Sequence, residues 1–410
     1  MLMAQLPYIE PEEADPVTKA VYDKAEARFE MVLNIFKITG NAPEIGSKMW
    51  EIFFEILRDG RVDWPTKELL ILKATKMGDC LYCVTQHEVV SERLGVTPEK
   101  QSDIVGVEYR KSPHFDDRER AILDLCAQVV LDPEQIPAET WAGVRRHFSD
   151  DQIVEILATI GAYVQVSKFG DAMGVELEPV FHGASRFCSR RSRRDRPLRL
   201  VTSSTSSTCR SGPEEGGAMA AVKLVERGQA DPSLAGVFEE AERHFGHVPN
   251  LVKALASNPE MCRSITEFLI QALGPGRLDW GLKQLVILKT LRSIKSHYSY
   301  GAHERLAVEL GVPAEKIGEL ANSLWRESPH FGEDERVLLE LVEQVARDAN
   351  DVSDELWERL RSHWDAGQLL EANAVNHDLH HGRPRRRRPR RLRSRVVHQA
   401  GRASRRAVGS

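Results

Sequence analysis

The chain has 410 residues, of which 41% are hydrophobic and 29% are charged, and its formal net charge at pH 7 is −5. This length accommodates two domains of ordinary size, each with a buried core. No segment approaches the roughly 20 consecutive apolar residues that a membrane span needs. The acidic start MLMAQLPYIEPEEADP also differs from a signal peptide. We therefore expect a soluble cytoplasmic protein without a membrane partner.

The net charge conceals two strongly basic segments. Residues 183–213 contain eight arginines and one acidic residue, and residues 383–410 contain twelve arginines and no acidic residue. The rest of the chain is therefore strongly acidic, which argues against a nucleic-acid partner.

The sequence repeats itself at a fixed distance of 216 residues without a gap. The short segments ADP, GRVDW (GRLDW in the second copy) and SPHF all return, as does a tryptophan. Their first residues are Ala14 and Ala230, Gly60 and Gly276, Ser112 and Ser328, and Trp141 and Trp357. We therefore predict two related domains, at residues 1–182 and 219–382.

Each repeat has the apolar spacing of helices. The segment PTKELLILKATKM, residues 65–77, places apolar residues at helical intervals, with Asp63 as the expected N-cap and Pro65 in the first turn. Residues 116–132 and 150–169 show the same spacing. No alternating strand with a hairpin signal is present. The sequence predicts an all-α fold of two similar helical domains.

The joints between and after the repeats have a different composition. Residues 183–218 are rich in Arg and Ser and are predicted to be a disordered linker, and residues 383–410 a disordered tail. Because PEEGG precedes Met219, one hypothesis is that two neighbouring genes are read as one, with residues 183–218 translated from intergenic or frame-shifted sequence. The repeat loses its match near Glu371, which indicates either a second frame shift or a basic tail that binds an acidic surface.

The segment GDCLYCVTQHE, residues 78–88, contains the candidate catalytic cysteines and histidine of the first repeat. If a helix starts here, Cys80, Cys83 and His87 lie at i, i+3 and i+7 and share one face. An imidazole can take the thiol proton, and a helix N-terminus stabilises the thiolate. A neighbouring thiol can convert a sulfenic acid to a disulfide. Glu68, in the preceding helix, can orient His87 or relay its proton.

These residues leave several alternatives open. The helix start favours Cys80 as the nucleophile, whereas the i, i+4 histidine favours Cys83, and Asp79 raises the pKa of the thiol beside it. A zinc site needs a fourth ligand, which no second Cys-x-x-Cys or histidine pair supplies. Two ordinary buried cysteines are the third interpretation. Cys126 lies on an apolar helical face and is expected to be inert.

The spacing of Glu68, Cys80, Cys83 and His87 is E-x11-C-x2-C-x3-H. It resembles the signature of alkylhydroperoxidase D-like proteins in the carboxymuconolactone decarboxylase superfamily. The resemblance implies an all-helical, oligomeric thiol enzyme that reduces hydroperoxides and is regenerated by a dithiol donor such as a lipoylated protein. It implies that Cys83 attacks the peroxide, that Cys80 resolves the product, and that His87 and Glu68 relay protons. Some members have histidine where Tyr82 stands here.

The second repeat serves as an internal control. The signature positions there are Gln284, Ser296, Ser299 and His303, so the second repeat is predicted to be inactive as a thiol peroxidase. Residues that persist in both repeats are interpreted as structural: Trp64 and Trp280, Asp63 and Asp279, His114 and His330, and Tyr82 and Tyr298.

No flavin, haem, nicotinamide or phosphate-loop motif is present, so no cofactor is expected. The leading functional hypothesis is a thiol-dependent peroxidase. Two alternatives are a decarboxylase or isomerase of small lactone acids and a non-catalytic helical scaffold.

Overall fold

The computed structural model describes residues 4–184, 222–294, 296–320 and 324–378. The predictions for the tail, and for nearly all of the 183–218 linker, lie outside these residues. Within the described ranges every regular element is a helix, which confirms the all-α prediction.

The first repeat contains nine α-helices and three short 3₁₀ helices among the described residues. They are α1 (Pro16–Phe29), α2 (Asn34–Thr39), α3 (Pro43–Ile56), α4 (Trp64–Gly78), α5 (Leu81–Arg93), α6 (Pro98–Asp103), η1 (Glu108–Arg110), α7 (Asp117–Leu131), η2 (Pro133–Gln135), α8 (Ala138–Arg145), α9 (Asp150–Met173) and η3 (Pro179–Phe181).

The described part of the second repeat follows the same order. Its elements are η5 (Arg227–Gln229), η6 (Pro232–Leu234), α10 (Ala235–Phe245), α11 (Asn250–Leu255), α12 (Pro259–Leu273), α13 (Trp280–Ile294), α14 (His297–Glu309), α15 (Ala314–Leu320), η7 (Leu324–Arg326), α16 (Glu333–Asp348), η8 (Ala349–Asp351), α17 (Asp354–His363) and α18 (Ala366–Asp378).

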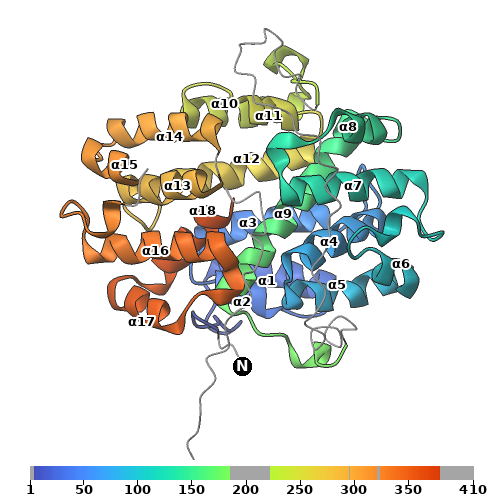
Figure 1. The fold of residues 1–410 in the computed structure, drawn as a ribbon, viewed down its shortest axis with the longest axis horizontal. Helices are drawn as coiled ribbons and strands as arrows, with labels where there is room; N and C mark the ends of the chain where they lie inside the picture. Colours follow the sequence, from blue (N-terminus) through green and yellow to red (C-terminus); the bar gives the residue numbers. More distant parts are fainter. Residues whose placement is uncertain (1–3, 185–221, 295, 321–323, 379–410) are drawn as a thin grey trace, which may run out of the picture.

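The helix starts reproduce the spacing of the sequence repeat. The helices α3, α4, α5, α7, α8 and α9 begin 216 residues before α12, α13, α14, α16, α17 and α18, respectively. Figure 1 shows the first repeat, blue to green, beside the second, yellow to red. The duplication seen in the sequence is therefore also a duplication of structure.

The two repeats pack through equivalent helices. Helix α3 packs against its counterpart α12, and α9 packs against its counterpart α18. Two ion pairs cross the interface at equivalent positions: Arg277 with Glu44 at 3.1 Å and Arg61 with Glu260 at 3.7 Å. A self-complementary contact of this kind is the arrangement of a two-fold dimer. The single chain therefore contains a pseudo-dimer.

Local sequence signals account for the helix that carries part of the site. Asp63 is the N-cap of α4 and its side chain accepts a hydrogen bond from the Thr66 backbone N–H, 2.8 Å away. Pro65 lies in the first turn, where no backbone N–H is needed. Both features confirm the predicted helix start. The two other predicted helices are confirmed as α7 and α9.

The glycine of the GRVDW motif is explained by a buried carboxylate. Glu155 of α9 is paired with Lys67 at 2.5 Å and accepts a hydrogen bond from the Arg61 backbone N–H at 2.7 Å. A Cβ placed on Gly60 would overlap Glu155 Oε1. A side chain at position 60 would therefore collide with this carboxylate. In the second repeat, Glu371 approaches Gly276 in the same way.

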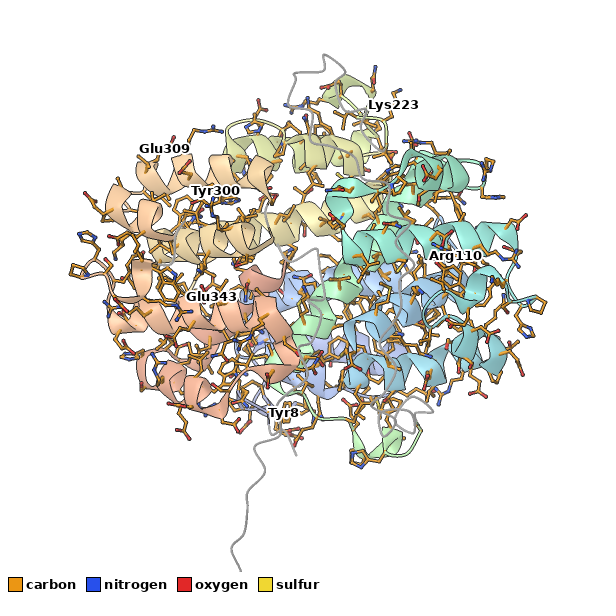
Figure 2. All side chains as sticks on the ribbon, viewed as in Figure 1. Tyr8, Arg110, Lys223, Tyr300, Glu309 and Glu343 are labelled. Atoms are coloured by element: carbon orange, nitrogen blue, oxygen red, sulfur yellow. The ribbon has the colours of Figure 1, made fainter. Side chains whose placement is uncertain are left out.

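One described helix, α9, has the length and hydropathy of a membrane span, and most of it is buried against other helices of the protein. A central core helix has this composition because it is covered on most sides. Charged side chains such as Arg110, Lys223 and Glu309 lie exposed on the outside of the molecule (Figure 2).

Candidate functional site

The site forms where α4 ends and α5 begins. Helix α4 ends at Gly78, and Asp79 adopts the left-handed conformation with φ of 61°, which aspartate tolerates better than most residues. Cys80 is the N-cap of α5, and its sulfur accepts a hydrogen bond from the Cys83 backbone N–H at 3.5 Å. This tight connection turns α5 back against α4, so that side chains from both helices meet.

Glu68 and His87 contact each other directly. His87 Nδ1 lies 2.8 Å from Glu68 Oε2, and the Glu68 side chain is fully buried. The other carboxylate oxygen accepts a hydrogen bond from Trp64 Nε1 at 2.8 Å. The Tyr163 ring meets the His87 ring edge to face, with centroids 4.8 Å apart. Because Nδ1 is held by the carboxylate, Nε2 is the nitrogen left to exchange a proton.

The two signature thiols occupy different environments. Cys83 lines the pocket together with His87, whereas Cys80 is fully buried and is not among the lining residues. Cys80, at the N-cap of α5, is therefore next to Cys83 but is not among the side chains that line the pocket with Cys83 and His87. Burial and the neighbouring Cys83 raise the pKa of the Cys80 thiol well above its usual value. Both thiols are free in this structure.

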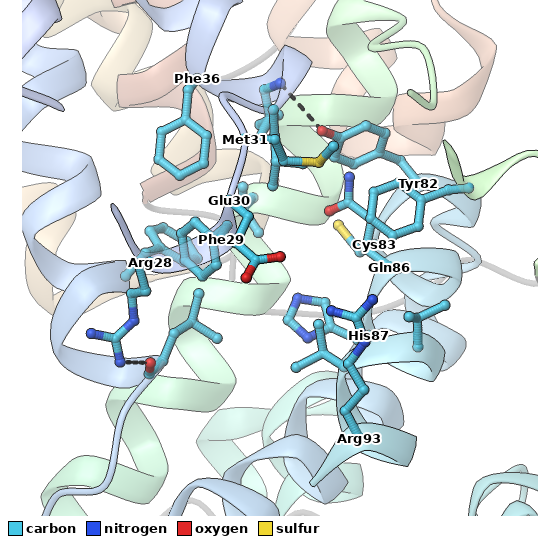
Figure 3. A pocket seen from close by; sticks show the side chains of 18 of the residues that line it. Arg28, Phe29, Glu30, Met31, Phe36, Tyr82, Cys83, Gln86, His87 and Arg93 are labelled. Atoms are coloured by element: carbon cyan, nitrogen blue, oxygen red, sulfur yellow. Dashed lines mark hydrogen bonds between the residues drawn. The ribbon is translucent and has the colours of Figure 1, made fainter. Parts of the chain in front are cut away.

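The pocket beside Cys83 has a volume of about 440 Å³. Figure 3 shows Cys83 and His87 on one side of it, with Glu30 and Arg93 near them. Most of the wall is apolar and comes from α1, α2, α3, α5 and α9. Its apolar lining includes Phe29, Met31, Phe36, Trp50, Phe53 and Leu57. The pocket can therefore hold an organic molecule against the Cys83 side of α5.

The wall is fixed by a buried hydrogen-bond network. The Tyr82 hydroxyl donates to Glu178 Oε1 at 2.9 Å and accepts from the Ile35 backbone N–H at 3.2 Å. Gln86 Nε2 donates to the other carboxylate oxygen of Glu178 at 2.9 Å. These contacts join α5 to α2 and to the segment after α9. Tyr82 thus has a structural role in shaping the pocket.

The corresponding position in the second repeat keeps the histidine but changes its partner. His303 Nδ1 lies 2.8 Å from Gln284 Oε1, and burial lowers the pKa of His303 to about 4. The indole N–H of Trp280 donates to the Leu273 carbonyl, 3.0 Å away, rather than to residue 284. The second repeat therefore preserves the scaffold of the site without its carboxylate and thiols.

Sequence reasoning missed two residues of this site. Trp64, interpreted as purely structural, binds Glu68; its i, i+4 spacing from that residue was an available signal. Tyr163 comes from α9, far away in the sequence, and no spacing pattern connects it with the signature. Within the described residues, no group of three or more His, Cys, Asp or Glu side chains is arranged to hold a metal ion.

Comparison with known proteins agrees with the duplicated helical architecture. Residues 43–110 and 259–344 each match the Carboxymuconolactone decarboxylase family. One region in each repeat is therefore similar to this family. The two matched regions begin at equivalent positions, at the starts of α3 and α12.

Individual relatives correspond to about one repeat. The uncharacterized protein YdfG of Bacillus subtilis (strain 168) is 23% identical over 134 residues, which cover 32% of this chain and 89% of that protein. The alkylhydroperoxidase AhpD core structure of an uncharacterized peroxidase-related protein from Ralstonia eutropha JMP134 is 19% identical, with a TM-score of 0.40. It covers 43% of this chain and 94% of its own. An uncharacterized peroxidase-related protein from Silicibacter sp. TM1040 is 21% identical, with a TM-score of 0.38. The match covers 42% of this chain and 91% of that protein.

Proposed function

We propose that the first repeat is a thiol-dependent peroxidase in which Cys83 attacks a hydroperoxide and Cys80 then forms a disulfide with it. The observation that carries this proposal is the placement of Cys83 on the pocket wall one helical turn before His87, whose other nitrogen is held by Glu68. The fully buried Cys80 lies at the start of the same helix, three residues from Cys83.

In the first step, His87 accepts the Cys83 thiol proton and Glu68 stabilises the resulting imidazolium. The thiolate attacks the terminal oxygen of R–O–OH, so the S–O bond forms as the O–O bond breaks. The alkoxide takes the proton back from His87 and leaves as the alcohol. Sulfur is thereby oxidised by two electrons to a sulfenic acid, and the peroxide is reduced by the same two electrons.

In the second step, the Cys80 thiolate attacks the Cys83 sulfur. The S–S bond forms, the S–O bond breaks, and the departing hydroxide is protonated to water. A dithiol donor, such as a lipoylated protein, then reduces the disulfide and becomes a disulfide itself. No cofactor is required for this cycle. Homo-oligomer formation and cytoplasmic location remain predictions from the sequence.

The pocket favours an organic hydroperoxide over hydrogen peroxide as the substrate. Burial of an apolar group against the apolar wall makes the binding free energy more favourable, and hydrogen peroxide has no apolar group. We expect cumene hydroperoxide to be reduced with a higher kcat/KM than hydrogen peroxide. Equal kcat/KM values for the two peroxides would show that the pocket does not select the substrate.

A thiol titration before and after one equivalent of cumene hydroperoxide tests the proposed function. We expect two thiols to disappear and peptide mass mapping to find a Cys80–Cys83 disulfide. Cys126 and Cys262 are the internal controls, because both are buried outside the pocket and should stay reduced. Survival of both signature thiols would overturn the proposal, and turnover of a carboxymuconolactone-type acid would then favour the decarboxylase alternative that the family match suggests.

A further inference from the structure

Cys80 has a partner that the peroxidase chemistry described above does not use. The carboxyl group of Asp171, in the last turn of α9, is a neighbour of the Cys80 thiol, and each group affects the pKa of the other. Because Cys80 is fully buried and lies away from the pocket, solvent cannot readily exchange protons with it. The neighbouring carboxyl group is therefore the group placed to do so.

Asp171 is in turn held by the second repeat. Asn350, in η8, donates a hydrogen bond from Nδ2 to Asp171 Oδ2 at 3.0 Å. Asn350 is itself fixed, since its backbone N–H donates to Asp348 Oδ1 at 3.1 Å. The contacts thus run from the second repeat, through Asp171, to the buried Cys80 thiol of the first repeat.

This contact departs from the pseudo-symmetry of the interface. The residue equivalent to Asn350 in the first repeat is Glu134, and the one equivalent to Asp171 in the second is Arg387, which lies outside the described residues. Unlike the ion pairs of Arg277 and Arg61, the Asn350–Asp171 pairing therefore has no counterpart with the same residue types. It is specific to the side of the interface that carries the thiols.

We propose that Asp171 exchanges a proton with Cys80 and that the second repeat positions Asp171 for this task through Asn350. This inference rests on the proposed peroxidase function. It gives the second repeat, which lacks the signature thiols, a role in the second step of the cycle, after the hydroperoxide has been reduced.

The Cys80 thiol proton passes to Asp171 and returns to Cys80 within one catalytic cycle. The Asp171 carboxylate takes the proton from Cys80–SH, and the Cys80 thiolate attacks the Cys83 sulfenic acid, forming the disulfide and releasing hydroxide, which solvent protonates. When the thiolate of the dithiol donor attacks Cys83, Cys80 leaves as a thiolate and takes the proton back from Asp171. The second donor thiol then attacks the donor sulfur bound to Cys83, loses its own proton to solvent, and releases Cys83 as a thiolate. A proton from solvent restores the Cys83 thiol.

The electrostatics of Asp171 suit this exchange. Burial, the adjacent Cys80 and the nearby Asp79 raise the pKa of the Asp171 carboxyl, whereas the hydrogen bond from Asn350 acts in the opposite direction. A carboxyl with a raised pKa holds a proton more readily, and the amide donor keeps the charged form accessible. Without Asn350 the Asp171 carboxyl would stay protonated, and a protonated carboxyl cannot take the proton from Cys80.

Rapid-mixing kinetics on the full chain test the proposal by separating the two steps. Cumene hydroperoxide is mixed with the reduced protein; the first step is followed by peroxide loss, and the second by the decay of dimedone-trappable sulfenic acid. We expect Asp171→Asn to slow the second step about 100-fold and Asn350→Ala about tenfold. The first step should be unchanged, because neither side chain lies in the pocket. The reduction potential of the Cys80–Cys83 pair should also change in Asp171→Asn.

Arg277→Ala is the matched control, because it removes another contact between the repeats without touching Cys80. It should leave both steps unchanged. If the unaltered protein forms the disulfide and both Asp171→Asn and Asn350→Ala form it at the same rate, the inference is overturned while the peroxidase function stands. If the unaltered protein forms no disulfide, the peroxidase function itself fails.

Discussion

His87 and His303 occupy equivalent positions in the two repeats and contact equivalent residues at the same distance. His87 faces the carboxylate of Glu68 at 2.8 Å, and His303 faces the amide of Gln284 at 2.8 Å. An anion stabilises an imidazolium, whereas a buried neutral amide does so far less. The second repeat therefore lacks the anion that faces His87, and burial keeps His303 neutral at pH 7.

The comparison shows that the structural features around the site are present in a repeat that lacks the signature thiols. The GRVDW turn, its buried Lys–Glu pair and the tryptophan at the start of the following helix occur in both repeats, although only the first repeat has the two signature thiols. Such features need another explanation than catalysis, and the Glu155 and Glu371 contacts with the turn supply one. Substitutions that give one repeat the residue of the other, or that remove a contact between the repeats, test this comparison.

Cys83→Ser gives the first repeat the residue found at Ser299 and should have the largest effect. A serine forms neither a sulfenic acid nor a disulfide, so we expect peroxide consumption to fall to the background rate. A coupled peroxidase assay measures this loss. Cys262→Ser, which changes a buried thiol of the second repeat, should retain full activity. Undiminished activity in Cys83→Ser would contradict the assignment.

Glu68→Gln gives the first repeat the amide of Gln284 and should slow oxidation of Cys83 about 100-fold, because an amide cannot stabilise the His87 imidazolium as a carboxylate does. Stopped-flow measurement of the first step checks this. If the rate at neutral pH is unchanged, Glu68 has no part in the proton relay.

The reverse exchange, Gln284→Glu, should raise the pKa of His303 from about 4, because a nearby anion favours the charged ring. An NMR titration of the His303 ring protons gives the value directly. At pH values between the old and the new pKa, His303 would then carry a charge that it lacks in the unaltered protein. A pKa that stays near 4 would indicate that the introduced carboxyl is itself protonated at this buried site.

Asn373→Leu restores the residue found at Leu157 and should raise stability. Both polar atoms of the Asn373 amide are buried without a hydrogen-bond partner, which costs about 1–3 kcal/mol. We expect the free energy of unfolding to increase by about this amount in urea titrations. A stability unchanged or lowered by the substitution would mean that the amide has a favourable partner in solution.

Arg277→Ala should have the smallest effect. Its pair with Glu44 crosses the repeat interface but both side chains are substantially exposed, and such pairs contribute about 0–1 kcal/mol. A double-mutant cycle with Glu44→Gln measures the coupling. A coupling free energy well above this range would show that exposed ion pairs between the repeats stabilise the pseudo-dimer more than expected from the packing of α3 with α12.

The sequence by itself determined the duplication, the helical class and the neighbouring positions of Cys83 and His87. A 216-residue offset is visible without coordinates, helical periodicity follows from 3.6 residues per turn, and i, i+4 spacing makes neighbours on one helix. Only the tertiary structure decided that Cys80 turns away from the pocket and that Asp171 and Asn350 meet beside it. Those contacts join residues more than 90 positions apart, and they depend on how helices pack, which no local pattern encodes.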